Sequence, residues 1–583
     1  MAEGDGSPSG VTLRELRVLE GPNLYFTRPA VKLTLGLEPW LAAPARSVEA
    51  AARRMGLRGT DREGSSARPG PPHSEQRRRF VIRIAAHLTR ALARAEGSGL
   101  AVRARSGPNP DEVIVAYPWR RRTAAEALGR ELAEAMRAVL GFRRSVPRLL
   151  RAAAERLASV EPGSAPDVPA PSVPVIAVTG TNGKTTTVRL LAHLARGAGR
   201  TVGYSSTDGV YVNGELVEEG DYSGFGGAAR ALSEPGVDIA VLETARGGIL
   251  LRGIGTAHND VAVVTNVSAD HLGLHGIHTL DQLAEVKATI TRITRPDGWD
   301  VLNADDPRVL GMRRNARGRP WLFSLDPDHP ALRSALSERG RAITVIDGWI
   351  SVLAPGRDPH PLLKLEDVPV TLAGLSSHNT QNALAATAAA LGVGLPEAAV
   401  VRGLRTFVLD PERNPGRMNL FELDGRVVVV DYAHNEAGMT GLVEAARGLC
   451  RPGAEVWLAF ASAGDRTDEI MHGMGYVAAR GADHVAVAEL ERYLRGRERS
   501  DVVDRLRAGA EDGGASDVPV FPHELAALEW MLESSRKHDV VALTALGQRP
   551  EIFAYLADRG GTKVGPKRIR SLVRRARGRA RTA

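Results

Sequence analysis

The chain has 583 residues, 43% of them hydrophobic and 25% charged, and at roughly 150 residues per domain it is long enough to bury several cores. Its one cysteine, Cys450, excludes an intramolecular disulfide and a zinc site built from several cysteines. The first twenty residues do not follow a secretory signal pattern, and no run of about 20 apolar residues occurs. We therefore expect a cytoplasmic protein that does not cross a membrane.

The formal net charge of +8 comes from the last residues of the chain. Residues 561–583 hold nine Lys or Arg and no acidic residue, and the remaining 560 residues hold 67 basic against 68 acidic residues. Such a segment is typical of a solvated, disordered end, which is the interpretation we favour. Binding of nucleic acid or of an acidic partner by this basic tail stays open.

Two segments rich in Gly, Pro and Ser interrupt the pattern of the first region. Residues 61–76 indicate a long loop, and residues 159–174, with five prolines, indicate a linker. Between them, Leu and Ala recur at helical spacing in 77–96 and 123–158, which predicts helices there.

After residue 174 the chain alternates between short β-branched runs and helix-length amphipathic segments. This alternation predicts parallel sheets covered by helices on both faces, the α/β class. The predicted strands are 175–179, 238–243, 260–265, 426–431, 455–460, 483–488 and 539–544.

A glycine-rich turn follows the first of these strands and has the composition of a phosphate-binding loop. It reads Gly180-Thr-Asn-Gly183-Lys184-Thr185, whereas the strict G-x-x-x-x-G-K-[ST] pattern would have a glycine in place of Val178. The glycines let backbone N–H groups converge on an anion, toward which the helix predicted to start near Thr185 points its positive end. Lys184 can reach the β- and γ-phosphates of a nucleotide, and the Thr185 hydroxyl can bind Mg²⁺. The alternative is a tight turn with a surface lysine.

Charged side chains follow the next two strands. Glu243 ends one, and a loop with Asp270, His271 and His275 follows the other. Ligands bind beyond the carboxyl ends of parallel strands, so Glu243 should stand near Lys184 and is a candidate Mg²⁺ ligand. A helix-capping role remains the alternative for Glu243, and a loop hydrogen bond remains the alternative for the histidines.

These residues carry a family resemblance. The phosphate loop, the strand-terminal glutamate and the "NVSADH" stretch together resemble the Mur ligase superfamily, whose members phosphorylate a carboxylate with ATP and let an amine attack the acyl phosphate. Residues 206–224, 242–250, 266–287, 303–307, 410–423 and 430–439 are similar to the Mur-like module of cyanophycin synthetases. Residues 18–37 are similar to the opening of their N-terminal domain, but the ATP-grasp module that follows in those enzymes is replaced here by the proline-rich linker.

The resemblance implies a domain order and a set of roles. The expected order is an α+β N-terminal domain (1–158), the linker (159–174), a phosphate-loop central domain with a parallel sheet (175–412), a C-terminal α/β lid (413–560) and the basic tail (561–583). Thr185, Glu243 and His271 match the Mg²⁺ ligands of the family, and Lys287 matches a lysine that many members carry as a carbamate, although a solvated lysine is the alternative. Asn379 and Asn382 match adenine contacts, with helix capping as the alternative.

Arg417 matches a hinge arginine that meets the phosphates, and Asp431 matches a ribose contact. The expected catalytic residues are Lys184, Glu243, His271, Lys287 and Arg417. The expected nucleotide contacts are Gly180, Thr181, Asn182, Gly183, Lys184, Thr185, Thr186, Asn379, Asn382, Arg417 and Asp431.

The resemblance implies an ATP- and Mg²⁺-dependent ligase that joins a substrate carboxylate, of a peptide for example, to the amine of an amino acid. We also expect a homo-oligomer. Two alternatives stay open: a nucleotide-binding scaffold with a vestigial ligase site that grips an acidic polymer or peptide, and a ligase of the folylpolyglutamate type.

Overall fold

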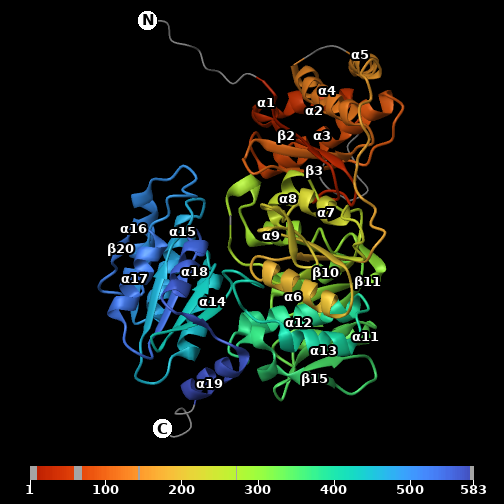
Figure 1. Cartoon of the computed structure of the whole chain (residues 1–583). Helices are drawn as coiled ribbons and strands as arrows, with labels where there is room; N and C mark the ends of the chain where they lie inside the picture. Colours follow the sequence, from red (N-terminus) through yellow and green to blue (C-terminus); the bar gives the residue numbers. More distant parts are fainter. Residues whose placement is uncertain (1–9, 58–67, 142–144, 271, 578–583) are drawn as a thin grey trace, which may run out of the picture. The chain divides into compact units, whose positions relative to one another are not determined.

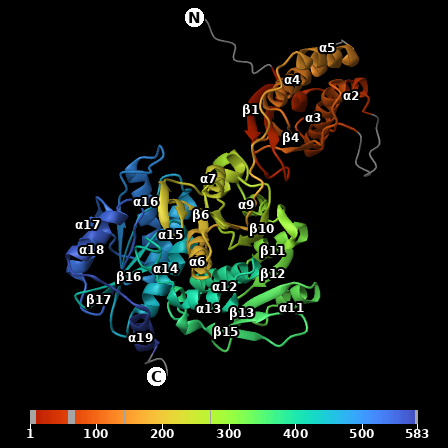
Figure 2. The same cartoon turned by 45° about the vertical axis from the view of Figure 1, so that its right-hand side comes forward.

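The computed structural model describes residues 10–57, 68–141, 145–270 and 272–577. It divides into two compact units (Figures 1 and 2). The first unit comprises Met1–Ala170, Arg246–Ala257 and His275–Ile277, and the second comprises Pro171–Ala245, His258–Leu274 and His278–Ala583. None of the helices in the described ranges combines the length and the apolar character that a membrane crossing requires.

The first unit is built on an antiparallel sheet with the strand order β1-β2-β4-β3 in the described residues. Its strands are β1 (Thr12–Leu19), β2 (Ala30–Gly36), β3 (Arg103–Ser106) and β4 (Glu112–Pro118), and its helices are α1 (Glu38–Ala42), α2 (Ala45–Arg54), α3 (Glu75–Ala95), α4 (Arg122–Gly141), α5 (Val146–Ala158) and α8 (Arg246–Leu251). The helices predicted at 77–96 and 123–158 are therefore present, the second as two helices.

The second unit contains a mixed central sheet of eleven strands in the described residues, in the order β15-β14-β13-β12-β11-β10-β5-β9-β6-β7-β8. The strands from β13 to β6 in this order run parallel, and antiparallel pairs complete both edges. The bounds are β5 (Val175–Thr179), β6 (Val202–Ser206), β7 (Gly209–Val212), β8 (Glu215–Glu219), β9 (Ile239–Glu243), β10 (Asn259–Val264), β11 (Thr294–Asn303), β12 (Arg319–Phe323), β13 (Arg341–Ile346), β14 (Trp349–Leu353) and β15 (His360–Lys364).

Helices cover both faces of the central sheet because its buried strands present apolar residues to both sides. Ile176 and Val178 pack in the core under the helices α6, α12 and α13, whereas Val175 packs on the other face with α7. α6, α12 and α13 lie side by side (Figures 1 and 2). The helices of this part are α6 (Lys184–Gly197), α7 (Phe225–Leu232), α9 (Leu280–Lys287), α10 (Pro307–Gly311), α11 (Pro330–Ser337), α12 (Ser377–Gly392) and α13 (Glu397–Thr406), with short 3₁₀ helices η1 (Leu274–Gly276), η2 (Met312–Asn315), η3 (Leu365–Asp367) and η4 (Pro369–Thr371).

A second sheet follows with the order β20-β19-β18-β21-β17-β16-β22 in the described residues. Val427 and Val429 pack in one cluster with residues of α14, α15 and α16, and Val428 and Val430 pack in another with residues of α17 and α18, as the period of two of a strand requires. The elements are β16 (Asn419–Leu423), β17 (Arg426–Asp431), α14 (Glu436–Leu449), β18 (Val456–Phe460), α15 (Asp468–Gly481), β19 (His484–Ala488), α16 (Arg499–Asp512), β20 (Val520–Phe521), α17 (Glu524–Ser534), β21 (Val540–Thr544), α18 (Arg549–Asp558), β22 (Thr562–Lys563) and α19 (Pro566–Arg577). The seven predicted strands are all confirmed to within one residue at each end, and so is the α/β class.

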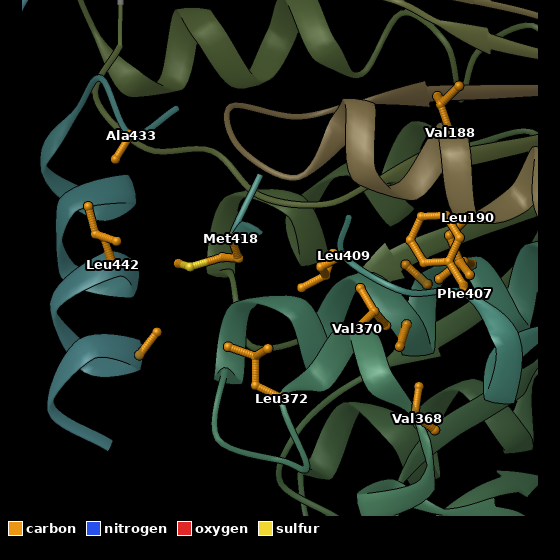
Figure 3. Packing of buried hydrophobic residues seen from close by; sticks show 14 of the residues in the cluster. Val188, Leu190, Val368, Val370, Leu372, Phe407, Leu409, Met418, Ala433 and Leu442 are labelled. Atoms are coloured by element: carbon orange, nitrogen blue, oxygen red, sulfur yellow. The ribbon is translucent and has the colours of Figure 1, made fainter. Parts of the chain in front are cut away.

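One hydrophobic cluster links the two sheets of the second unit. Leu372, before α12, and Leu442 of α14 both belong to it. Figure 3 shows the side chain of Met418, at the start of the second sheet, pointing toward the helix that carries Leu442. The second sheet is thus packed against the central one through apolar side chains.

The expectation of a disordered basic tail is wrong for the part that the structure describes. β22 pairs with β16, and α19 buries Ile569, Leu572 and Val573 against the cluster that includes α14. Arg568 pairs with Glu422 at 2.7 Å. The three apolar residues recur at helical spacing, so burial of one face outweighs the repulsion among the basic residues on the other. Residues 578–583 of the tail lie outside the described residues.

Candidate functional site

The turn between β5 and α6 needs glycine at two positions. Gly183 has a φ of 85°, and a Cβ atom there would stand 2.2 Å from Oδ1 of Asn382. At Gly180, whose φ is 155°, a Cβ atom would stand 1.8 Å from Oγ1 of Thr265. Neither position has room for a side chain, so only glycine lets the backbone of this turn pass so close to Thr265 and Asn382.

The segment after β10 fixes the shape of the turn. The backbone N–H of Thr181 donates to the Asn266 carbonyl at 2.9 Å, and that of Asn182 donates to Oδ1 of Asn266 at 2.9 Å. The Thr265 hydroxyl donates to the Asn182 carbonyl at 2.6 Å. Beyond these residues, the first turn of α6 begins at Lys184 and provides N–H groups that have no acceptor within the helix. These groups and the positive end of the helix make the turn suited to an anion.

Glu243, at the end of β9, lies directly beside Thr185. The Thr185 hydroxyl donates to Oε2 of Glu243 at 3.0 Å, whereas Oε1 is buried and has no hydrogen-bond partner. Burial raises the pKa of Glu243, against the opposing effects of Lys184 and the Thr185 hydroxyl. An unsatisfied buried carboxylate oxygen next to a hydroxyl fits a hard cation such as Mg²⁺, which takes one or two carboxylates together with water and phosphate oxygens.

Within the described ranges, no group of three or more His, Cys, Asp and Glu side chains could hold a metal ion. The third predicted ligand, His271, lies outside the described residues. Thr185 and Glu243 are thus the two predicted metal ligands that the structure brings together.

Two lysines contact the carbonyl groups of the phosphate loop. Nζ of Lys184 donates to the Thr181 carbonyl at 2.8 Å. Nζ of Lys287, at the end of α9, donates to the Gly180 carbonyl at 2.6 Å, and the residue is only 3% exposed. The alternative of a solvated lysine is therefore wrong for Lys287, which lies against the back of the loop.

A cavity opens over the loop and is bordered by the second sheet. Most of the predicted nucleotide contacts line it, and it is also bordered by His378, Tyr432, His434 and the start of α14. The predicted residues that line it are Thr181, Asn182, Gly183, Lys184, Thr185, Thr186, Asn379, Arg417 and Asp431. The structure thus gathers residues from both sheets around one cavity.

Arg417 and Asp431 lie together on the side of the cavity formed by the second sheet. The Arg417 guanidinium stands 4.2 Å from the centre of the Tyr432 ring, and the N–H of Met418 donates to Oδ2 of Asp431 at 2.8 Å. Burial lowers the pKa of Arg417 and raises the pKa of Asp431, while the attraction between the two groups opposes both shifts. Desolvated charges of this kind interact strongly with a charged ligand.

Asn379 and Asn382 form a pair at the start of α12. Nδ2 of Asn382 donates to Oδ1 of Asn379 at 3.1 Å. The N-cap of this helix is Ser376, whose hydroxyl accepts from the N–H of Asn379. The capping alternative for the two asparagines is therefore wrong: Asn379 reaches the cavity, and Asn382 lies beneath Gly183.

Three residues of the site, Asn435, His434 and Arg466, were not predicted from the sequence. The side-chain amides of Asn182 and Asn435 donate to each other at 3.1 Å and 3.0 Å, which joins the loop to the N-cap of α14. Asp270 pairs with Arg466 at 3.3 Å and with His434 at 3.8 Å. These contacts could not be predicted because the partners are far apart in the sequence. The one available signal is that each residue lies in or near a stretch rich in Gly, Asn or Asp.

Residues 303–307 (Asn-Ala-Asp-Asp-Pro) support the loop after β10. Nδ2 of Asn303 donates to the Thr265 carbonyl at 2.8 Å, and Asp306 accepts from the N–H of Val267 at 2.6 Å. His275, by contrast, belongs to the first compact unit and lines a cavity there with Arg14, Glu15 and Lys32.

Two protein-family models match the chain. The model of the Mur ligase middle domain matches residues 178–390, and the model of the Mur ligase glutamate ligase domain matches residues 416–547. The first match contains the phosphate loop, Glu243, Lys287 and the asparagine pair, and the second contains Arg417 and Asp431.

Individual relatives show how much of the chain is shared. The cyanophycin synthetase of Crocosphaera subtropica is 40% identical over 372 residues, which are 64% of this chain and 42% of that protein. The chain therefore spans about two fifths of the length of that relative. The UDP-N-acetylmuramyl-tripeptide synthetase of Deinococcus radiodurans is 28% identical over 437 residues, which are 73% of this chain and 82% of that protein.

Among solved structures, the bifunctional folylpolyglutamate synthase/dihydrofolate synthase of Yersinia pestis aligns with a TM-score of 0.48 and 18% identity over 66% of this chain and 89% of that chain. With the middle and C-terminal domains of Mur ligases in tandem, the chain belongs to the Mur ligase family.

Proposed function

We propose that the chain is an ATP-dependent ligase that activates a substrate carboxylate as an acyl phosphate and joins it to an amine, forming a C–N bond. The observation that carries this proposal is the single cavity in which the phosphate loop meets Arg417 and Asp431, with Glu243 beside Thr185. The family membership and the amide-forming relatives support the same reaction class.

In this proposal the nucleotide occupies the cavity over the loop. The backbone from Gly180 to Thr186 and the first turn of α6 hold the phosphates, and Lys184 turns from the Thr181 carbonyl to the β- and γ-phosphates. Asn379 and Asn382 hold the adenine, Asp431 holds the ribose and Arg417 contacts the phosphates. All of these residues line the cavity or touch a residue that lines it.

Thr185, Glu243 and His271 are the proposed ligands of Mg²⁺. A bound Mg²⁺ would supply positive charge beside the phosphoryl group that is transferred. The free Oε1 atom of Glu243 is the strongest support, since its burial without a partner is costly unless a cation or a donor meets it.

Lys287 is proposed to act as a carbamate, as in many members of the family. Its burial against the Gly180 carbonyl supports this, because addition of CO₂ would turn a cation that Mg²⁺ repels into an oxygen ligand. Mass spectrometry of the intact chain after rapid trapping of carbamates would test it: an added CO₂ on Lys287 supports the assignment, and an unmodified lysine contradicts it.

The reaction then needs positioning and charge stabilisation more than covalent chemistry by the protein. Lys184 and Arg417 neutralise the γ-phosphoryl group as it moves from ATP to an oxygen of the substrate carboxylate, with ADP as the leaving group. The amine next attacks the carbonyl carbon of the acyl phosphate, loses a proton and displaces inorganic phosphate. The products are the amide, ADP and phosphate. The proposed substrates are a carboxylate-bearing molecule, such as a peptide, and an amino acid.

Binding of ATP in the presence of Mg²⁺, measured by calorimetry, tests the nucleotide site directly. The wild type should bind, Lys184→Ala should bind much more weakly, and the exposed Lys537→Ala on the loop before β21 should bind as the wild type does. Wild-type protein that does not bind ATP, or equal binding by folded Lys184→Ala, would contradict the assignment.

A further inference from the structure

Asp208 lies in the turn between β6 and β7 and forms ion pairs with two arginines. Arg189 of α6, which is almost fully buried, forms an ion pair with Oδ2 of Asp208. Arg549, the first residue of α18 beside the second sheet, pairs with Oδ1 at 3.1 Å. Each carboxylate oxygen thus holds a different guanidinium, and the two guanidiniums come from helices of the two different sheets.

The same arginines hold the segment that leads into the second sheet. Nη1 of Arg189 donates to Oδ1 of Asn414 at 3.3 Å, and Nη1 of Arg549 donates to the Pro415 carbonyl at 3.3 Å. Nδ2 of the fully buried Asn414 donates to the Thr186 hydroxyl of the phosphate loop at 3.3 Å. Arg549 also stands so close to Gly416 that a Cβ atom there would lie 2.7 Å from its Cδ.

A second set of contacts holds this segment from the side of β16. Nδ2 of Asn419 donates to the Asn414 carbonyl at 3.0 Å, and the N–H of Gly416 donates to Oδ1 of Asn419 at 2.7 Å. The next residue is Arg417, which lines the nucleotide cavity. The backbone that carries Arg417 is therefore fixed at Asn414, Pro415 and Gly416, and two of these contacts come from arginines that Asp208 holds.

The ion pairs of Asp208 with Arg189 and Arg549 are better suited to fixing the position of a segment than to stabilising the fold. Although burial alone would raise the pKa of Asp208, the guanidiniums of Arg189 and Arg549 lower it, so the carboxylate stays charged. A buried ion pair gains little net stability because its groups lose their hydration, but removal of one partner leaves an uncompensated charge. Such a network constrains geometry, and here the constrained group is Arg417.

We propose that Asp208 is a positioning residue that holds the Asn414–Arg417 segment, and with it the second sheet, in the orientation that directs Arg417 at the nucleotide. This proposal rests on the proposed function in so far as Arg417 is taken to contact the phosphates. Asp208 does not line the nucleotide cavity and acts through Arg189 and Arg549.

Hydrogen–deuterium exchange on the full-length protein without nucleotide tests the positioning itself. Residues 410–419 should exchange faster in Asp208→Asn and in Arg549→Gln than in the wild type. Their exchange rate in Arg549→Lys should lie between those in the wild type and in Arg549→Gln, because lysine keeps the charge but lacks the planar guanidinium. The matched control is Arg447→Gln, which removes an ion pair of 2.7 Å to Asp483 that lies within the second sheet and its helices. Its 410–419 segment should exchange as in the wild type.

Binding and turnover of ATP by the same variants provide the functional readout. Misplacement of Arg417 should reduce turnover by about tenfold to 100-fold. The double variant Asp208→Asn/Arg549→Gln should be no worse than the worse single variant, because both changes release the same segment. If Asp208→Asn does not fold, the Arg549 variants carry the test, since Arg549 is partly exposed.

The two proposals fail separately. The positioning role would be overturned if residues 410–419 exchanged as in the wild type in folded Asp208→Asn and Arg549→Gln. It would also be overturned if the losses of ATP turnover in the two single variants added in the double variant. Neither result would contradict ATP binding by the wild type. A wild type that does not bind ATP would overturn the proposed function, and the exchange data would still decide whether Asp208 holds the segment.

Discussion

Thr185 donates its hydroxyl hydrogen to one oxygen of the Glu243 carboxylate at 3.0 Å, and the other oxygen of Glu243 is buried without a partner. The first turn of α6 and the end of β9 are thereby joined beside the cavity that Thr185 lines. The unsatisfied oxygen makes Glu243 the residue at which the proposed Mg²⁺ site can be tested.

Replacement of Glu243 by glutamine should therefore separate ATP binding from its dependence on Mg²⁺. Glu243→Gln keeps the shape and the Thr185 contact but removes the charge, so ATP should still bind through the loop and Lys184. Mg²⁺ should no longer strengthen that binding, and turnover should be lost. Calorimetric titration with and without Mg²⁺ checks this. An unchanged response to Mg²⁺ would exclude Glu243 as a ligand.

Gly183 offers a test of the phosphate loop with a control in the same helix. Gly183→Ala should weaken ATP binding, because the residue has a φ of 85° and the new methyl group would meet Oδ1 of Asn382 at 2.2 Å. Gly197→Ala, at the end of α6, has open space and should be neutral or stabilising by up to about 1 kcal/mol. Thermal unfolding and ATP titration of both variants would show the contrast. Equal ATP affinity of the two would contradict the phosphate-loop assignment.

The basic C-terminal helix is expected to contribute to stability. Leu572 of α19 is 9% exposed, and Leu572→Ala should lower the free energy of unfolding by about 2–3 kcal/mol. Arg575→Ala changes an exposed residue of the same helix and should be nearly neutral. Denaturant unfolding checks both. If Leu572→Ala proves as neutral as Arg575→Ala, α19 is not packed in solution as it is here.

Asp300 of β11 should make the free energy of unfolding depend on pH. Burial raises its pKa from 3.8 to about 7, although the Thr294 hydroxyl and the Gly318 N–H, each at 2.7 Å, oppose this. The folded state thus binds the proton more tightly than the unfolded state, and the resulting stability is lost as the pH rises from about 4 through about 7. At about 1.4 kcal/mol per pKa unit, the effect is on the order of a few kcal/mol.

Asp300→Asn should remove this part of the pH dependence, and the exposed Asp297→Asn should keep it. Thermal unfolding of the three proteins across this pH range is the measurement. Parallel curves for the wild type and Asp300→Asn would show that Asp300 does not titrate in this range.

The parts of the fold that depend on local pattern could be predicted from the sequence. The strand 426–431 was predictable because four consecutive valines are bounded by charged residues, and the phosphate loop was predictable because its glycines and Lys184 are contiguous. The helix of the tail could also have been found, since Ile569, Leu572 and Val573 recur at helical spacing among the arginines. We predicted disorder instead because the segment holds nine basic residues and no acidic one.

The contacts that complete the site could not be predicted in this way. Asn182 and Asn435 are 253 residues apart, and Asp208 and Arg549 are 341 residues apart. Such pairs depend on how the two sheets pack, and periodicity within one element carries no information about that. The buried state of Lys287 has the same origin, because the last turn of α9 meets the phosphate loop only in the folded chain.

Activation of a carboxylate by phosphorylation leaves an acyl phosphate that hydroxylamine can trap. Full-length protein would be incubated with ATP, Mg²⁺, hydroxylamine and a panel of acidic peptides and amino acids, and the nucleotide products would be separated. We expect a hydroxamate with equal amounts of ADP and phosphate for at least one carboxylate, and no hydroxamate with Lys184→Ala or Glu243→Gln. AMP and pyrophosphate as products would contradict this mechanism, and so would ATP that binds but is not cleaved with any member of the panel, the behaviour of a nucleotide-binding scaffold.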